Sequence, residues 1–94
     1  VLRIEMTLSE ATALLDARLR RYRGSTYEQL IPLLNHPAYA EGISPSGAAF
    51  RTEVSVFWEK YPFGNLRVFG IIDGFFDSDT PAPVTQSFIV APED

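Results

Sequence analysis

Two segments in the second half of the chain alternate residue by residue between two sets of side chains, as β-strands do. The segments are Ala49–Lys60 and Leu66–Asp73, and Tyr61-Pro62-Phe63-Gly64-Asn65 between them has the proline and glycine of a turn. Together they predict an antiparallel hairpin. A pairing shift of one residue would exchange the two faces, so the alternation indicates which side chains share a face.

Cross-strand pairs suggest a register for this hairpin. Aromatic pairs and pairs of opposite charge stabilise adjacent antiparallel strands. The register that satisfies both preferences places Trp58 opposite Val68, Phe57 beside Phe69 and Glu59 beside Arg67. It also places Glu53 opposite Asp73.

Helix signals occupy the first third of the chain. Thr7-Leu8-Ser9-Glu10 has the form of a capping box, in which Glu10 reaches back to the Thr7 amide. Behind it, apolar residues recur at helical spacing, and we predict a helix over Leu8–Arg23. Asp16 and Arg20 are spaced to pair on its exposed side. Gly24 is expected to end the helix in the left-handed conformation.

The next segment is less regular. Ser25-Thr26-Tyr27-Glu28 resembles a second capping box and predicts a short helix from about Thr26 that is kinked or ended near Pro32, with a short strand as the alternative for Tyr27–Leu34. Asn35–Gly47 has no hydrophobic period and is predicted to be a loop.

The chain closes with further strand signals. Phe75 and Phe76 are expected to begin a short strand, and Val84–Val90 alternates again. Helices followed by strands predict an α+β fold. We expect the helix at the start of the chain and the short second helix to pack on one face of an antiparallel sheet of three to four strands, within a single domain spanning residues 1–94.

Composition excludes several classes of protein. The net charge is −4, which argues against general binding to nucleic-acid phosphates, and Arg18–Arg23 is typical of a helix C-terminus. With no cysteine and one histidine, the chain lacks the ligands of a Cys/His zinc site. No apolar run approaches the roughly 20 residues of a membrane helix. We therefore expect a soluble cytoplasmic protein with no cofactor, no metal and no membrane or nucleic-acid partner.

The strand residues resemble a family of small bacterial domains of unknown function. The matching residues lie in the half of the chain from Gly47 to Asp94, and they are Val54-Ser55-Val56-Phe57-Trp58-Glu59, Leu66-Arg67-Val68, Ile72-Asp73-Gly74 and Phe88-Ile89-Val90-Ala91-Pro92-Glu93. The family pattern continues through Pro-Asp-Gly, whereas this chain has Pro92-Glu93-Asp94. The resemblance implies a bacterial α+β domain and assigns no catalytic residue.

Three residue groups could support chemistry, and each has a simpler explanation. His36 could act with Ser44 or Ser46, but no nucleophile-elbow motif accompanies them, and a loop histidine is the simpler interpretation.

The acidic groups are likewise explained by turns and strand ends. Asp73, Asp77 and Asp79 have the alternating spacing of a calcium loop, but without its later glycine and glutamate they read as a polar turn. Glu53 and Asp73 could share a proton if they were adjacent. We assign no catalytic and no metal-binding residue.

Apolar side chains on both faces of the predicted sheet point to a function in binding. One amphipathic helix can cover one face, which leaves the other as a candidate interface. Its residues are Phe57, Phe69, Ile71, Ile89, Arg67 and Glu59. We therefore expect a non-catalytic protein-interaction module that binds a protein partner or a second copy of itself. The competing expectation is that Phe75, Phe76 or the Asn35–Gly47 loop folds over this face.

Two alternative functions remain open. The first is a small enzyme or ligand-binding domain with a pocket between helix and sheet, with Trp58, Tyr22 and Tyr39 as wall residues. The second is an immunity- or antitoxin-like partner of a neighbouring protein, which fits the small size and acidity of the chain.

Overall fold

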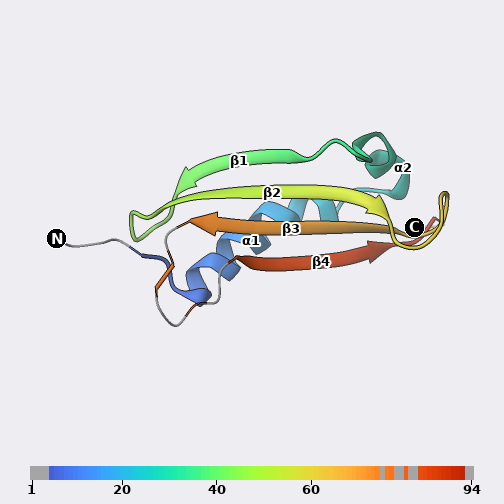
Figure 1. Cartoon of the computed structure of the whole chain (residues 1–94). Coiled ribbons are helices and arrows are strands. Elements are labelled where there is room, and N and C mark those ends of the chain that lie inside the picture. Colours follow the sequence, from blue (N-terminus) through green and yellow to red (C-terminus); the bar gives the residue numbers. More distant parts are fainter. Residues whose placement is uncertain (1–4, 75, 78–79, 81–82, 93–94) are drawn as a thin grey trace.

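The protein folds as two helical segments followed by a four-stranded antiparallel sheet (Figure 1). The computed structural model describes residues 5–74, 76–77, 80 and 83–92. The strands follow one another across the sheet in the order β1-β2-β3-β4. The elements are α1 (Leu8–Arg23), α2 (Tyr27–Leu30), the 3-10 turn η1 (Ile31–Leu33), β1 (Ala38–Ile43), β2 (Ala49–Trp58), β3 (Leu66–Gly74) and β4 (Val84–Val90). This confirms the predicted α+β class.

Helix α1 has the predicted bounds. Thr7 caps it by accepting a hydrogen bond from the Glu10 amide at 3.1 Å. The return bond of the capping box is not formed, because the Glu10 carboxylate binds Ser46 instead. Gly24 ends the helix with a φ of −85°, so the prediction of a left-handed residue is wrong. Its amide donates to the Arg20 carbonyl, which keeps the last turn within ordinary right-handed geometry.

The second helix forms where it was predicted, with a capping box shifted by one residue. Thr26 accepts from the Gln29 amide, and the Gln29 side chain accepts from the Thr26 amide at 2.8 Å. The box is therefore Thr26 to Gln29 and not Ser25 to Glu28. Pro32 lies inside η1, where the helix tightens and ends.

Strand β1 corrects the prediction of a loop over Asn35–Gly47. Ala38–Ile43 pairs with β2 from Ala38 opposite Val54 to Ile43 opposite Ala49. The hydrophobic period is hidden because Ala38, Ala40 and Gly42, which alternate with the exposed residues, are small.

The β2–β3 pairing differs by two residues from the predicted register. Trp58 pairs with Leu66 and Phe57 pairs with Arg67. A shift of two residues preserves the faces, so the alternation could not distinguish the two registers. The loop decides between them, because the Glu59 amide donates to the Asn65 carbonyl at 2.9 Å and closes the hairpin there.

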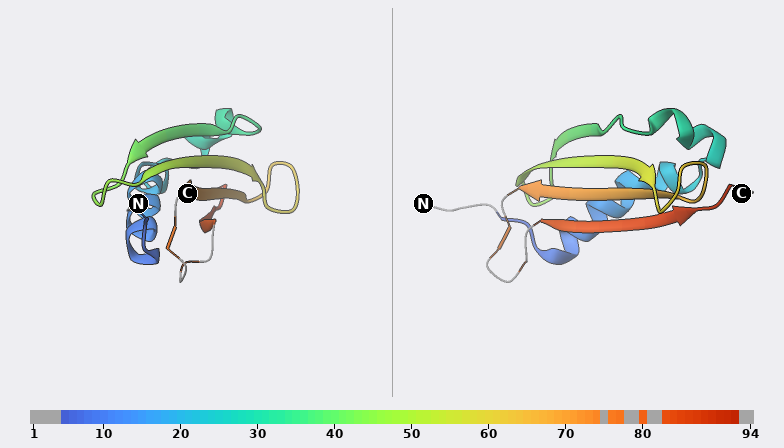
Figure 2. Two further views of the ribbon diagram at one scale, coloured as in Figure 1. Left: turned by 60° about the vertical axis from the view of Figure 1, so that its left-hand side comes forward. Right: turned by 45° about the vertical axis from the view of Figure 1, so that its right-hand side comes forward.

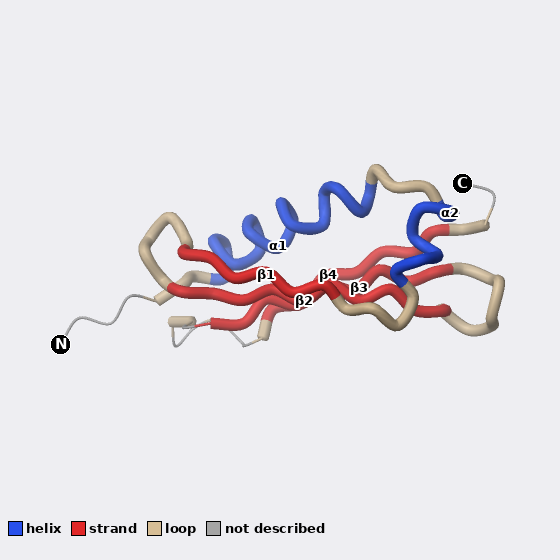
Figure 3. The backbone as a smooth tube through the Cα atoms, turned by 90° about the horizontal axis from the view of Figure 1, so that it is seen from above, coloured by secondary structure: helices blue, strands red, loops and turns tan. Residues whose placement is uncertain are grey.

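The core lies between α1 and one face of the sheet. Viewed along the sheet, both helices lie on the same side of the strands (Figure 3), and the views in Figure 2 agree. Helix α1 crosses β3 at Gly70, where a Cβ atom would lie 3.0 Å from side-chain carbons of Leu15 and Leu19. The core side chains are Met6, Ala11, Leu15, Leu19, Tyr22, Leu30, Ala48, Val54, Val56, Leu66, Val68 and Ile72.

Two further features complete the fold. Phe76 forms an isolated parallel bridge with Met6 and packs against the core, so it does not begin a regular strand, and Phe75 lies outside the described residues. Within the described part of the chain, no helix has the length and apolar character needed to cross a membrane.

Candidate functional site

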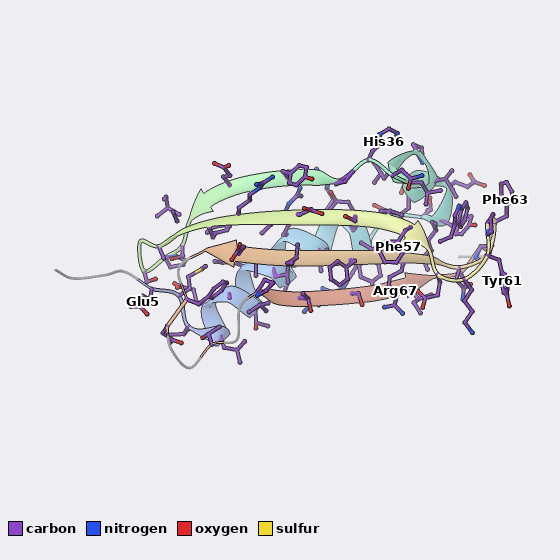
Figure 4. The ribbon with its side chains drawn as sticks, viewed as in Figure 1. Glu5, His36, Phe57, Tyr61, Phe63 and Arg67 are labelled. Carbon is purple, nitrogen blue, oxygen red and sulfur yellow. The ribbon has the colours of Figure 1, made fainter. Side chains whose placement is uncertain are left out.

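The sheet face opposite α1 carries the residues predicted as an interface. We call this surface the open face; it comprises the outward side chains of β1 to β4. In the sheet register, Phe57, Arg67 and Ile89 form one row across three strands. The side chain of Phe57 is 39% exposed and that of Ile89 is 48% exposed. Figure 4 shows Phe57 and Arg67 on this side of the sheet, with α1 behind it.

Phe69 and Ile71 continue the apolar strip of the open face along β3. Both are half-buried. Phe69 lies between Ser55 and Ser87 in the register, and Ile71 lies between Glu53 and Thr85. All four cross-strand neighbours are polar, and Ser55, Ser87 and Thr85 are also short. The Asn35–Gly47 segment, one of those expected to fold over this face, instead contributes β1, which widens the sheet.

Arg67 and Glu59 form an ion pair at the end of the apolar strip. The Arg67 Nη2 atom donates to Glu59 Oε1 at 2.9 Å, and Arg67 Nε donates to the other carboxylate oxygen. These bonds hold the pKa of Glu59 below its ordinary value, although desolvation offsets part of the effect. The same bonds raise the pKa of Arg67. Arg67 Nη1 also donates to Ser87 at 2.7 Å, so the guanidinium is fixed against β4.

The loop between β2 and β3, at the end of the sheet next to Phe57, carries two exposed aromatic rings that the sequence pattern marked only as part of a turn. Tyr61 is 71% exposed and Phe63 is 84% exposed. Phe63 has a φ of 66°, a left-handed conformation that is unfavourable for a bulky residue. Its ring centroid lies 5.6 Å from that of Trp58. The signal in the sequence was two aromatic residues within a turn whose other residues are proline, glycine and asparagine.

This loop is held in place and borders a hollow. The Tyr27 hydroxyl of α2 donates to the Gly64 carbonyl at 2.8 Å. Beside the loop, a depression of about 420 Å³ is lined by Glu59, Lys60, Tyr61, Gly64, Asn65 and Ile89. Ile89 therefore borders both the apolar strip and the hollow.

The three aromatic residues proposed as pocket walls do not share a pocket. Tyr22 is buried in the core, and Trp58 packs against the core from the helix side of β2. Tyr39 lies opposite Glu53 on the open face, where it is 53% exposed. The guanidinium of Arg51 lies 4.4 Å from the centroid of the Tyr39 ring. Tyr39 and Arg51 border a second, smaller depression of about 210 Å³.

His36 and the two serines lie at opposite ends of β1. His36 precedes the strand, whereas Ser44 follows it. Ser44 and Ser46 are 3.0 Å apart through their hydroxyl oxygens, and Ser46 donates to Glu10 at 2.7 Å from its hydroxyl. These contacts join the β1–β2 turn to the first turn of α1, and they explain the serines as structural residues.

The acidic groups are also separated. Asp73 faces Arg51 and not Glu53, because of the two-residue shift in register. Asp77 accepts a hydrogen bond from the Thr80 hydroxyl at 2.7 Å, and Asp79 lies outside the described residues. Among the residues that the structure describes, no group of three acidic or histidine side chains could hold a metal ion.

The arginines at the end of α1 have neighbours within the molecule. Arg23 pairs with Asp16 at 2.7 Å, in place of the predicted Asp16–Arg20 pair, and it also donates to Gln86 of β4. Arg18 and Arg21 lie over the ring of Tyr22. Arg23 therefore helps to fix α1 on the sheet, whereas the contacts of Arg18 and Arg21 with Tyr22 lie within the helix.

No family model, curated protein or solved structure matches this chain.

Proposed function

We propose that this protein is a non-catalytic protein-binding module that holds a partner against the open face of its sheet. The observation that carries the proposal is the exposure of Phe57 and Ile89, near the end of the sheet beside the β2–β3 loop, on a sheet whose helices pack only on the other face. Aromatic and aliphatic side chains surrounded by charged groups are typical of the centre of a protein interface.

The β2–β3 loop adds a second part to the proposed interface. Phe63 is exposed and adopts a backbone conformation that costs free energy. Strained exposed residues cluster at functional sites, which supports a role in contacting the partner. The hollow beside Ile89 is large enough to accept a side chain from the partner.

The charges on the open face suggest the character of the partner. Six charged side chains lie on this face in the register, with four acids and two arginines: Glu41, Glu53, Glu59, Asp73, Arg51 and Arg67. Arg67 is already paired with Glu59. A partner with an apolar centre and a basic rim would complement this surface.

A binding function is favoured over catalysis by the arrangement of the polar groups. His36 is separated from Ser44 and Ser46 by β1, and Tyr22, Trp58 and Tyr39 lie on two sides of the sheet. The motif resemblance and the acidic composition support placing this module in a bacterial cytoplasm as part of the same proposal.

Site-specific photocrosslinking tests this proposal. A photoreactive phenylalanine analogue is placed at Ile89 on the open face or, as the matched control, at exposed Glu28 on α2. We expect a crosslinked protein from position 89 only, and its yield should fall when Phe57→Ser is added. Equal crosslinking from both positions, or crosslinking from position 28 alone, would contradict the proposal. A small molecule that blocks crosslinking and binds the purified chain would favour the ligand-binding alternative.

A further inference from the structure

The free edge of β1 is a second surface of the molecule with a defined geometry. Strand β1 pairs with β2 on one side, and Figures 1 and 2 show no other described element along its far side. Natural edge strands use proline, lysine or bulges to prevent pairing with another chain. Ala38–Ile43 contains neither proline nor lysine, and its six residues pair with β2 without interruption.

The direction of the backbone groups can be assigned along this edge. In an antiparallel pair, alternate residues point their N–H and C=O groups toward the partner strand. At the two ends of β1, the Ser44 amide donates to the Ala48 carbonyl at 2.8 Å, and the Asn35 amide donates to the Val56 carbonyl at 3.4 Å, so the even-numbered residues of β2 point their carbonyls toward β1. The even-numbered residues of β1 therefore face β2. Tyr39, Glu41 and Ile43 direct their backbone donors and acceptors away from the sheet.

We propose that a second copy of this chain pairs with this edge, with the two β1 strands antiparallel about a two-fold axis at Ala40. In this register Tyr39 lies opposite the partner's Glu41, and each pair exchanges backbone hydrogen bonds. The symmetry repeats every contact, as in an isologous dimer. The residues on the helix side of β1 are Ala38, Ala40 and Gly42, and their small size lets the two strands approach.

Charge complementarity selects this register. The Arg51 guanidinium lies over the ring of Tyr39. The partner's Glu41, opposite Tyr39, is therefore placed beside a positive charge, and this contact occurs twice. Centring the pairing on Glu41 would set two carboxylates against each other, which is unfavourable. Centring it on Tyr39 would set the partner's Glu41 opposite Pro37 instead of Tyr39, and so away from the Arg51 guanidinium over that ring.

This inference is independent of the proposed function, and it would enlarge the surface on which that function depends. Pairing of the two edges joins two four-stranded sheets into one of eight strands. The open faces of both copies then lie on the same side of a continuous sheet.

Sedimentation equilibrium on the full chain tests the dimer. We expect the native protein to associate to twice the mass of the chain. Glu41→Arg should weaken association at least about tenfold, because it brings an arginine at position 41 of each copy beside Arg51 of the other. Glu41 also lies opposite Arg51 within its own chain, so circular dichroism must show that the fold of this variant is unchanged. The charge reversal Glu41→Arg with Arg51→Glu should restore association. Glu28→Arg is the matched control, because it makes the same charge change at an exposed residue of α2.

Oxidation of single-cysteine variants tests the register. The native chain has no cysteine, so each introduced thiol can react only with its copy. Ala40→Cys lies on the two-fold axis and should form a disulfide dimer, whereas Glu41→Cys should do so much more slowly. A monomeric native protein would overturn the proposal, as would a dimer unaffected by Glu41→Arg. A dimer lost in Phe57→Ser but retained in Glu41→Arg would instead place self-association on the open face.

Discussion

Arg67 and Glu59 show how charged residues are accommodated beside an apolar strip. Their hydrogen bonds satisfy both carboxylate oxygens of Glu59, and the third contact of Arg67 is to Ser87. Because the folded state lowers the pKa of Glu59, the pair stabilises the protein above the ordinary glutamate pKa. This contribution is lost as the pH falls through the lowered folded-state pKa.

Removing the guanidinium should therefore change the titration of Glu59. In Arg67→Gln, we expect the pKa of Glu59 to rise toward its ordinary value, because the hydrogen bonds that favour the carboxylate are lost. Carbon-detected NMR of the carboxyl group measures this change. Arg51→Gln removes a charge from the same face without removing these bonds, and it should leave the Glu59 titration unchanged. An unaltered Glu59 pKa in Arg67→Gln would contradict this assignment.

Phe63 is the residue whose conformation is least explained by folding alone. It combines a positive φ with high exposure, and glycine would adopt this backbone without strain. We expect Phe63→Gly to keep the free energy of unfolding within about 1 kcal/mol of the native value, because relief of strain offsets the lost contact with Trp58. Urea denaturation measures this difference.

The control for this prediction is Tyr61→Gly, because Tyr61 is also exposed but does not have a positive φ. Tyr61→Gly should have a lower free energy of unfolding than Phe63→Gly. The new glycine increases the entropy of the unfolded chain, and at position 61 it relieves no backbone strain. A loss of several kcal/mol in Phe63→Gly would show that Phe63 serves the fold and would remove it from the proposed interface.

At the scale of elements, the contact between α1 and β3 depends on Gly70. The close approach of Leu15 and Leu19 leaves no room for a branched side chain there. We expect Gly70→Val to destabilise the protein by about 1–3 kcal/mol, because overpacking forces the helix away from the sheet. Thermal unfolding followed by circular dichroism measures the loss. Thr85→Val introduces valine on the open face of the neighbouring strand and should cost much less; equal losses would refute the packing argument.

Elements with a strong period were predictable from the sequence, and those defined by small residues were not. Helix α1 and strand β4 have the predicted bounds because capping and apolar spacing mark them. Strand β1 was missed because its inward residues are alanine and glycine. The predicted β2–β3 register was wrong by two residues, because such a shift preserves the faces and the alternation does not show where the Glu59–Asn65 hydrogen bond closes the hairpin.

The candidate site was predictable to the same extent. The alternation placed Phe57, Arg67 and Ile89 on one face, and the register brings them into one row. Tyr39 was assigned to the wrong side because its strand was not recognised. Tyr61 and Phe63 were missed because turn residues indicate a change of direction but do not indicate whether a ring faces solvent.

At the scale of the whole molecule, the core is built on one side of the sheet. The radius of gyration is 14.8 Å, compared with about 12 Å for a compact chain of this length. An extended two-layer shape leaves a large fraction of one sheet face in solvent. The proposed binding surface is therefore the open face, and the buried contacts that stabilise the fold lie on the helix side.

These two roles should separate in variants of the open face. We expect Phe57→Ser to change the free energy of unfolding by no more than about 1 kcal/mol, because the side chain is already partly exposed. Leu19→Ala, which truncates a fully buried side chain, should cost about 2–5 kcal/mol. Chemical denaturation measures both, and comparable losses would contradict a division between the two sides.

The affinity of the crosslinked partner for the native chain and for Phe57→Ser tests the central claim most directly. Isothermal titration calorimetry should show a loss of about 2 kcal/mol, or roughly 30-fold in affinity, since a partly exposed aromatic residue at the centre of an interface is a hot spot. The melting temperature should remain close to that of the native chain. An unchanged affinity in Phe57→Ser would contradict the assignment of partner binding to the open face.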